Sequence, residues 1–414
     1  MKLLYIIFIE LLRVGLWLGS FFNDKLKKGW QGRKQSFAKV GRAFTKRDKV
    51  IWMHAASLGE YEQGLPVLEK LKQQYPDYKI LVSFFSPSGY ENVVKKKTIA
   101  DVICYLPLDR KSEIRAFLDL MNIQIFFTVK YDYWYHLLNE LKKRKVKVFV
   151  ISALFYPNQV FFKSYGRFFV QQLKNNIDWF FHQNKASFDL AKNIGLEKSS
   201  IAGDTRYDRV KENAQNAVKV PFIKDFLQGQ KCVVFGSAWQ AEEKVAEILA
   251  HQFEGKIIIA PHDLKRVQNL LQIFPNALRY SEFENKGVIA KSQILIIDCI
   301  GLLSNLYAYA DVSVVGGGFH SAGLHNILES AVFGNPVLFG NQYQNHPEAD
   351  DLIRAKGGQS FRTEEMLAEE LMCLLNNDEK RLAMSENARQ FIIHQPNASR
   401  HILTKIATDF SSSL

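Results

Sequence analysis

Short apolar runs alternate with amphipathic stretches along most of this chain. Runs typical of buried strands are separated by segments whose apolar residues recur at helical spacing, as at residues 60–74. Because a strand that is followed by a helix commonly returns to its sheet as a parallel strand, this rhythm predicts an α/β protein with doubly wound parallel sheets. The predicted strands lie at residues 50–53, 79–84, 102–105, 123–128, 146–151, 179–182, 231–236, 256–260, 294–298, 312–315 and 336–339.

The rhythm of strands and helices is interrupted by a polar segment at residues 206–219. A chain of 414 residues also exceeds the size at which a single core usually stops growing. We therefore expect two Rossmann-like domains, at residues 50–205 and 220–395, with residues 206–219 as the linker between them. Residues 396–414 follow the second domain and are expected to form a C-terminal helix.

The first 22 residues are almost continuously apolar. The stretch from Leu3 to Phe22 is long enough to span a hydrocarbon core as a helix. Glu10 and Arg13 oppose spanning, because a charge near the centre of the bilayer costs about 2.5–3.5 kcal/mol. We expect a membrane anchor at residues 1–22, either spanning or lying in the interface. A cleaved signal peptide is disfavoured, since no cleavage site with small residues follows.

A basic segment at residues 23–49 follows this apolar helix. Residues 23 to 50 contain ten lysines and arginines against two aspartates, a net charge of +8 out of +12 for the chain. Such a segment attracts anionic lipid, and positive charge beside an anchor favours the cytoplasmic side for the bulk of the chain. The neighbouring apolar helix makes a membrane surface a better partner for these charges than nucleic acid.

The overall composition is that of a globular protein, with 47% hydrophobic and 23% charged residues. The four cysteines, Cys104, Cys232, Cys299 and Cys373, are widely spaced, so we expect reduced core residues and no disulfide framework. No cluster of histidine, cysteine and aspartate has the spacing of a metal site. We therefore expect neither a metal ion nor another cofactor.

The segment at residues 312–329 carries the first candidate chemistry. A predicted strand ends in three glycines, Gly316 to Gly318, and a helix is expected to begin near His325. Glycines before a helix N-terminus let backbone N–H groups approach an anion, which the helix dipole also favours. Asn326 and Glu329 would share one face of that helix, where a carboxylate can accept hydrogen bonds from sugar hydroxyls. The alternative is an ordinary turn whose glycines serve packing.

Several motifs resemble the 3-deoxy-D-manno-octulosonic acid (Kdo) transferases. That family has a glycine turn followed by Gly-X-His-Asn-X-Leu-Glu, which is similar to the segment ending at Glu329. Its Ser-X-Gly-Glu motif is similar to Ser57-Leu-Gly-Glu60. Further matches, in the same order along the chain, are Ser86 to Gly89, Ile201 to Asp208 and Phe235 to Ser237. The resemblance implies the GT-B architecture: two Rossmann-like domains that face a central cleft, with the last helix crossing back onto the first.

The resemblance implies that Glu60 is the general base, on a loop with Ser57 and Gly59 that meets the acceptor. Asp132 stands where the family has a glutamate, and Arg206 where the family has a lysine. A cation there can neutralise charge on the leaving phosphate or on the sugar acid. The alternatives are that Glu60 only caps its helix and that Arg206 only pairs with a neighbouring aspartate.

The resemblance also implies where the donor binds. His262 stands where the family has an arginine, and Ser237 opens a helix that it alternatively only caps. The implied donor-binding residues are Ser237, Pro261, His262, Ile300, Gly301, Leu302, Gly316, Gly317, Gly318, Asn326, Ile327, Leu328 and Glu329.

By this resemblance the chain is expected to be a metal-independent, inverting transferase. It would move Kdo from CMP-Kdo, a substrate and not a cofactor, to a lipid A precursor (lipid IVA) and release CMP, in lipopolysaccharide synthesis at the cytoplasmic face of the bacterial inner membrane. Two alternatives stay open. One is another GT-B enzyme, such as a UDP-sugar transferase or a nucleotide-sugar epimerase, and the other is a lipid-binding scaffold without catalytic activity.

Overall fold

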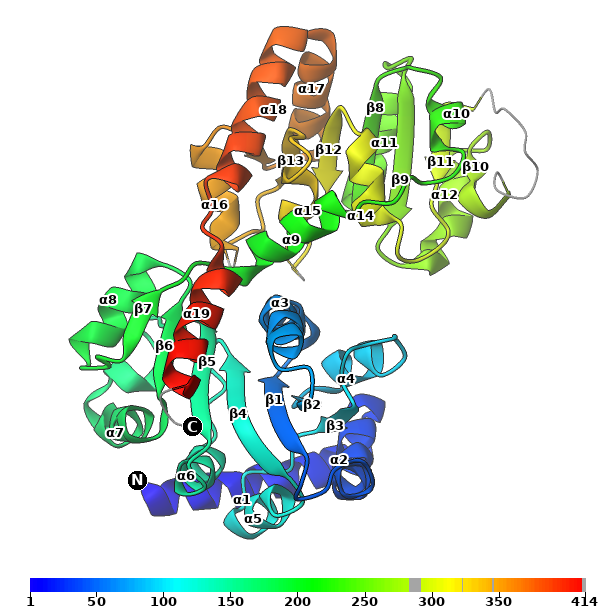
Figure 1. The fold of residues 1–414 in the computed structure, drawn as a ribbon. Coiled ribbons are helices and arrows are strands. Elements are labelled where there is room, and N and C mark those ends of the chain that lie inside the picture. The colour runs from blue at the N-terminus through cyan, green and yellow to red at the C-terminus, as the bar shows by residue number, and fades with distance from the viewer. Residues whose placement is uncertain (283–291, 322, 345, 412–414) are drawn as a thin grey trace. The chain divides into compact units, whose positions relative to one another are not determined.

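The computed structural model describes residues 1–282, 292–321, 323–344 and 346–411 (Figure 1). The chain divides into two compact units. Unit 1 contains Met1–Arg209 and Pro396–Leu414, and unit 2 contains Val210–Gln395.

Unit 1 is built on a seven-stranded sheet in the order β3-β2-β1-β4-β5-β6-β7. Every neighbouring pair in it is parallel. The strand order reverses between β1 and β4, and ligands of open α/β sheets bind at the carboxyl ends of the strands at such a point. The strands are β1 (Lys49–Ala55), β2 (Lys79–Phe84), β3 (Val102–Tyr105), β4 (Asn122–Val129), β5 (Lys147–Ala153), β6 (Trp179–His182) and β7 (Ser199–Ile201).

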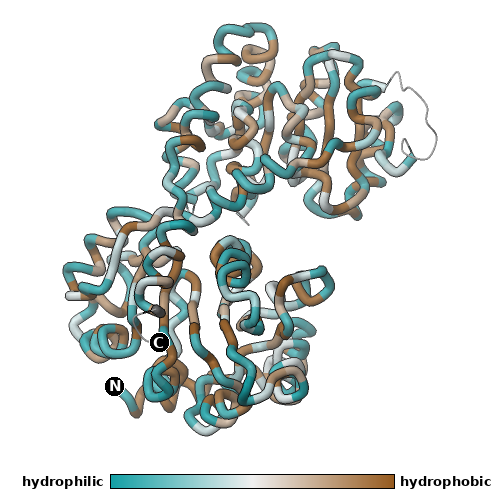
Figure 2. The backbone as a smooth tube through the Cα atoms, in the orientation of Figure 1, coloured by the Kyte–Doolittle hydropathy of each residue, from teal (hydrophilic) through white to brown (hydrophobic). Residues whose placement is uncertain are grey.

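Helices cover both faces of this sheet, and residues of its strands pack into two apolar cores. Figure 2 shows hydrophobic residues along the central strands. On β1, Val50 and Trp52 pack into one core, whereas Ile51 and Met53 pack into the other. The helical elements after β1 are α3 (Leu58–Gln74), α4 (Pro87–Val93), α5 (Lys111–Leu118), α6 (Tyr135–Lys143), η1 (Val160–Phe162), η2 (Ser164–Gly166), α7 (Arg167–Asn176) and α8 (Lys185–Asn193). Helix α9 (Thr205–Gln215) begins in unit 1 and ends in unit 2.

Two further parts of the chain complete unit 1. The C-terminal helix α19 (Ala398–Ser411) buries Ile402, Ile406 and Phe410, which recur every four residues, in the core that contains Ile51. At the other end of the chain, α1 (Lys2–Gly19) and α2 (Asp24–Ala43) precede β1. In the part of the chain that the structure describes, no single helix has both the length and the apolar composition to cross a membrane. The pair α1 and α2 passes that test only together, with a bend of 119° at the junction.

Unit 2 repeats the architecture with the strand order β10-β11-β9-β8-β12-β13-β14, again all parallel. Its order reverses between β8 and β12. The strands are β8 (Cys232–Ala238), β9 (Lys256–Pro261), β10 (Leu278–Arg279), β11 (Ile294–Ile296), β12 (Val312–Val315), β13 (Val337–Gly340) and β14 (Gly358–Phe361). The helical elements are α10 (Ile223–Leu227), α11 (Gln240–Ala250), η3 (Leu264–Arg266), α12 (Val267–Ile273), α14 (Leu303–Leu306), η4 (Tyr307–Tyr309), α15 (Leu328–Ala331), α16 (Pro347–Arg354), α17 (Glu364–Asn376) and α18 (Asp378–Ile393).

The prediction of two doubly wound α/β domains is confirmed. All eleven predicted strands are present, within one or two residues at their ends, whereas β7, β10 and β14 were not predicted because they are short and lack an apolar run. Residues 206–219 are not an open linker throughout, since α9 runs to Gln215. Only two of the four cysteines are core residues: Cys104 and Cys232 are buried, but Cys299 and Cys373 are exposed.

Candidate functional site

A buried histidine and a carboxylate meet where the strand order of unit 1 reverses. His54 lies near the carboxyl end of β1 and is fully buried. Its Nε2 lies 2.6 Å from Oδ2 of Asp132, which stands in the loop after β4 and has a side chain 19% exposed. Because β1 and β4 are neighbours, this contact joins the loops that follow both strands.

A chain of hydrogen bonds leads from the core to Asp132. The Nε1–H of Trp52 donates to Oγ of Ser83 over 2.7 Å, and this hydroxyl lies 2.8 Å from Nδ1 of His54. Nδ1 also lies 3.1 Å from the carbonyl oxygen of Ser83. Because an ionised carboxylate only accepts hydrogen bonds, the proton on Nε2 of His54 is the one that faces Asp132. Although serine, histidine and aspartate stand in series, Ser83 is fully buried and cannot act as a nucleophile on a bound substrate.

Glu60 lies in the first turn of α3, directly after β1. Ser57 caps the helix by accepting the N–H of Glu60 at 3.4 Å, and Oε2 of Glu60 accepts the N–H of Ala56 at 2.5 Å. The carboxyl is nearly buried, with 7% of the residue exposed. Burial raises its pKa, and the charge of Asp132 raises it further, whereas the N–H of Ala56 and the cationic side chain of Lys130 lower it.

In the structure, Asp132 is thus close enough to Glu60 for its charge to raise the pKa of Glu60. A carboxylate with a raised pKa suits a general base, because proton transfer is most efficient when the pKa lies near the working pH. Glu60 also contributes hydrogen bonds at the start of its helix, as the capping alternative expects, and its role as a general base stays a prediction. Gly59 beside it has open space where a side chain would lie.

Arg206, the third predicted catalytic residue, lies at the start of α9. Its guanidinium pairs with Asp204, with Nη2 and Oδ2 2.7 Å apart. The Nε2 of Gln63, on α3, donates to the same aspartate over 3.3 Å. The alternative interpretation of Arg206, an ion pair with a neighbouring aspartate, is therefore realised in the structure.

In unit 2, a cavity of about 1210 Å³ opens at the carboxyl ends of the central strands. Of the predicted donor residues, it is lined by Ser237, Pro261, His262, Ile300 and Gly301. It is also lined by residues that the sequence analysis did not select, among them Trp239, Cys299, Phe319 and His320.

Trp239 organises one wall of this cavity. Its indole is stacked between the rings of His262 and His320, with centroid distances of 4.4 Å and 4.2 Å. The indole N–H donates to Nε2 of His325 over 3.2 Å. Burial, with the neighbouring imidazoles His262 and His346, lowers the pKa of His325 to about 4. His325 is therefore neutral at pH 7 and can accept this bond.

The glycine turn lies against the same wall and is packed tightly. A Cβ on Gly316 would lie 2.0 Å from the carbonyl oxygen of Ser237, and one on Gly318 would lie 2.5 Å from the amide nitrogen of Gly340. Gly317 has a φ of +88°, which favours glycine, and its backbone N–H faces the carboxyl of Glu242. Burial raises the pKa of Glu242 to about 7, although the N–H groups of Trp239 and Gly317 oppose this. The three glycines thus have a packing role, which was the alternative interpretation.

The helix after the glycine turn differs from the prediction. It begins at Leu328, not near His325, and α15 is only four residues long. Asn326 precedes it, accepting the N–H of Leu328 at 3.2 Å and donating to Oε1 of Glu329 over 3.1 Å. Asparagine satisfies backbone groups outside a helix well, which explains the later start.

Asn326 and Glu329 therefore contact one another as predicted, but neither they nor Ile327, Leu328, Leu302 and the three glycines line the large cavity of unit 2. Glu329 instead borders a small hollow with Val210 and Asn213. The sequence did carry signals for the missed residues. His54 is a polar residue on the same strand face as Trp52, within an otherwise apolar strand, and Trp239 directly follows β8.

In the described part of the chain, no group of three or more histidine, cysteine, aspartate or glutamate side chains could hold a metal ion.

Comparison with known proteins points to one family. Residues 28–209 match the sequence profile described as 3-deoxy-D-manno-octulosonic-acid transferase (kdotransferase). A 3-deoxy-D-manno-octulosonic acid transferase of Chlamydia muridarum is 26% identical over 365 residues, which cover 85% of this chain and 84% of that protein. The corresponding transferase of Haemophilus influenzae is 24% identical over 380 residues, covering 85% of each chain. A bifunctional glycosyltransferase/methyltransferase of Fusobacterium nucleatum is 27% identical over 357 residues, but the chain spans only 54% of its length.

Solved structures agree on the fold. A UDP-GlcNAc 2-epimerase from Neisseria meningitidis, bound to UDP-GlcNAc, has a TM-score of 0.59 at 16% identity and covers 87% of this chain and 100% of its own. MurG from Acinetobacter baumannii has a TM-score of 0.54 at 14% identity, with 87% and 99% covered. These similarities support the GT-B type of fold. By sequence, the chain is similar to the 3-deoxy-D-manno-octulosonic acid (Kdo) transferases, both in residues 28–209 and in relatives whose similarity extends over about 85% of the chain.

Proposed function

We propose that this protein transfers Kdo from CMP-Kdo to a hydroxyl of a lipid A precursor and releases CMP. The observation that carries the proposal is the nearly buried Glu60, whose pKa is raised by burial and by Asp132, within residues 28–209 that match the transferase family. Unit 1 would bind the acceptor, and unit 2 would bind the donor in its cavity of about 1210 Å³. A cavity of that size can enclose a nucleotide sugar.

The chemistry assigned to Glu60 is proton removal. Its carboxylate takes the proton of the acceptor hydroxyl while the hydroxyl oxygen forms a bond with the anomeric carbon of Kdo. The bond from that carbon to the phosphate oxygen breaks on the opposite side, and its electron pair leaves with CMP, so the anomeric configuration inverts. Burial raises the pKa of Glu60, and the charge of Asp132, which His54 holds in place, adds to this; both bring the base closer to the working pH.

On the donor side, the proposal assigns phosphate recognition to the protein alone. Ser237 and His262 line the cavity of unit 2 and can donate hydrogen bonds to a phosphate. Arg266 lines the same cavity, and its guanidinium pairs with Glu243. These donors would stabilise the charge on the leaving CMP, so we propose a mechanism without a divalent ion.

The proposed location is the cytoplasmic surface of a bacterial inner membrane, with α1 in the membrane interface. The face of α1 that carries Ile9 is held on unit 1, whereas the opposite side is apolar and exposed. The exposed apolar residues of α1 and the turn after it are Leu3, Leu4, Ile6, Ile7, Phe8, Leu11, Val14, Trp17, Leu18, Phe21 and Phe22. Exposed lysines of α2, including Lys25, Lys27, Lys28 and Lys34, follow directly. An apolar helical face followed by lysines suits an anionic bilayer and an acceptor that has acyl chains and phosphates.

An interfacial position of α1 is favoured over a spanning one by its contacts with unit 1. Glu10 pairs with Arg110 at 2.7 Å, and Ile9 is buried. A spanning orientation would break these contacts and take a carboxylate into the hydrocarbon core.

The direct test of the function is release of CMP from CMP-Kdo by the purified protein, with and without lipid IVA. Release that depends on the lipid supports the proposal. Release without any acceptor, or conversion of a UDP-sugar in its place, would support the alternative enzymes, and absence of turnover would support the scaffold.

A change of Glu60 to Gln should lower transfer by roughly 10²- to 10⁴-fold, the usual contribution of a general base. CMP binding should be retained, because the donor cavity belongs to unit 2. Glu62→Gln, on the same helix but only partly buried, is the matched control and should be active. If the Glu60→Gln variant is fully active, Glu60 is not the general base and only caps its helix.

The pH dependence of kcat/KM should reflect the raised pKa of Glu60. A base is active when deprotonated, so kcat/KM should fall as the pH drops through that pKa, above the usual glutamate value of about 4.3. The negative charge of Asp132 favours the protonated form of Glu60. Asp132→Asn should therefore move the acid limb to lower pH, even though the maximal rate falls. If the acid limb of kcat/KM lies at the same pH in Asp132→Asn as in the wild type, the charge of Asp132 does not act on the pKa of Glu60.

The donor cavity can be tested by calorimetry with CMP. His262→Ala should weaken CMP binding by about 1.5–3 kcal/mol, the range for hydrogen bonds to charged groups. His394→Ala, which removes an exposed imidazole in the same unit, is the control. If Glu329→Ala weakens CMP binding and His262→Ala does not, CMP binds next to Glu329 and not in this cavity.

Membrane binding can be measured by sedimentation with vesicles. The protein should bind vesicles that contain anionic lipid, and binding should weaken as salt screens the basic segment. Replacing Phe21 and Phe22, which are 66% and 90% exposed, with serine should reduce binding without a change in turnover of detergent-dispersed acceptor. Binding that is equal to wild type in this variant would contradict the interfacial position.

A further inference from the structure

We propose that Tyr5 of α1 is a positioning residue for the loop at residues 130–134, which carries Asp132. This inference rests on the proposed function for its kinetic consequences, but its structural basis is independent of it. It differs from the view that residues 1–22 only tether the enzyme.

The first step is the start of α6, which directly follows that loop. Its N-cap residue, Trp134, makes no side-chain hydrogen bond to the helix. The first three N–H groups of a helix need partners from outside, and buried ones are costly when unpaired. In α6 these partners come from two distant segments of the chain.

The partners are Tyr5 and Asp109. The N–H of Tyr135 donates to the hydroxyl of Tyr5 over 3.2 Å. The next two N–H groups, of His136 and Leu137, donate to the two carboxylate oxygens of Asp109 over 2.7 Å and 2.8 Å. Asp109, in the loop after β3, thus acts as a cap supplied from outside the helix.

Tyr5 and Asp109 also bind each other. The hydroxyl of Tyr5 donates to Oδ2 of Asp109 over 2.6 Å, and only 1% of Asp109 is exposed. The ring of Tyr5 lies edge-on to that of Tyr135, with centroids 5.4 Å apart. One side chain of α1 therefore contacts the first residue of α6 and the carboxylate that caps the next two.

The second step connects the helix start to Asp132, which stands two residues before Trp134. The indole of Trp134 stacks on Phe85, with centroids 5.1 Å apart, and the middle of the loop is held by the 2.6 Å contact between Asp132 and His54. A shift of the α6 N-terminus would be transmitted through two residues to this contact. Tyr5 therefore helps to keep Asp132 on His54 and close enough to act on the pKa of Glu60.

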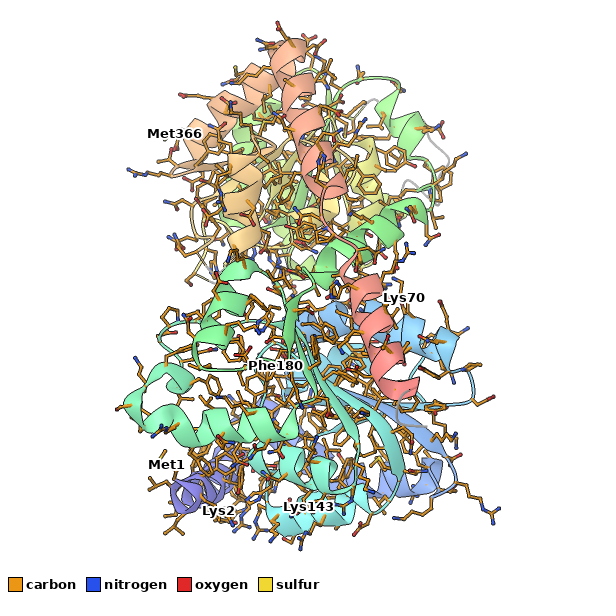
Figure 3. The ribbon with its side chains drawn as sticks, turned by 60° about the vertical axis from the view of Figure 1, so that its left-hand side comes forward. Met1, Lys2, Lys70, Lys143, Phe180 and Met366 are labelled. Carbon is orange, nitrogen blue, oxygen red and sulfur yellow. The ribbon has the colours of Figure 1, made fainter. Side chains whose placement is uncertain are left out.

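The third step concerns α1 itself. Glu10 of α1 pairs with Arg110, the neighbour of Asp109 in sequence, and Ile9 is buried. Figures 1 and 3 show the start of α1 within unit 1, where Met1 and Lys2 are labelled in Figure 3. Tyr5 and Ile9, one turn apart, thus hold one side of the helix on unit 1, whereas the other side carries the exposed apolar residues.

The structural arm of the test is hydrogen exchange in full-length Tyr5→Phe. The amides of residues 135–137 should exchange about two- to tenfold faster, as expected for the loss of one hydrogen bond. Tyr165→Phe is the matched control, because Tyr165 is 58% exposed, and it should leave these amides unchanged. Unchanged exchange in Tyr5→Phe would overturn the proposal whether or not the protein is a Kdo transferase.

The kinetic arm separates positioning from general destabilisation. In Tyr5→Phe, kcat with detergent-dispersed acceptor should fall roughly ten- to hundredfold, as for a displaced catalytic group, while KM for CMP-Kdo and CMP affinity stay unchanged. The acid limb of kcat/KM should move to lower pH, in the same direction as in Asp132→Asn. Faster exchange with wild-type kcat and pH profile would overturn the positioning role. A wild-type protein without transferase activity would contradict the proposed function and leave the exchange result to decide the structural claim.

Discussion

The hydrogen bond between His54 and Asp132 is the contact on which the candidate site of unit 1 depends. It joins the ends of β1 and β4, where the strand order of the sheet reverses. From there the hydrogen bonds continue into the core through Ser83 and Trp52, so the position of a partly exposed carboxylate is set by fully buried groups. A charged acceptor also strengthens the bond, because hydrogen bonds to ionised groups are the stronger ones. The raised pKa of Glu60, and with it the proposed general base, follows in part from where this bond places Asp132.

Unit 2 has an analogous arrangement with different residues. Its strand order reverses between β8 and β12, and the loops after these two strands meet there. Gly316 packs against the carbonyl of Ser237, and Glu242 receives N–H groups from both loops. This close backbone packing places Trp239 and its two stacked histidines along the cavity. The glycines therefore contribute to the cavity by allowing its wall to pack closely. That their backbone N–H groups bind an anion stays a prediction.

The N-terminal helix combines exposed apolar residues with polar residues that pair with distant parts of the chain. Its apolar residues predict contact with lipid, which stays a prediction, and many of them are exposed in the structure. Tyr5 and Glu10 belong to the same apolar stretch, yet they pair with Asp109 and Arg110 about 100 residues away. A polar group within an apolar helix is costly unless it finds a partner, and here the partners are in the folded domain rather than in the membrane.

The sequence by itself determined the doubly wound architecture, because strand and helix periods are local and the apolar runs of buried parallel strands are continuous. Local motifs also placed Glu60 at the start of a helix after a strand. The resemblance to a family assigned Ser237 and His262 to one site, and the structure places both at one cavity. The helix expected at His325 was wrong, because the side chain of Asn326 offered the backbone an alternative to helix. His54, Trp239 and the capping of α6 by Tyr5 and Asp109 were decided only by the tertiary structure. Each depends on contacts between segments far apart in the sequence, and local periodicity carries no information about which distant side chain satisfies a buried polar group.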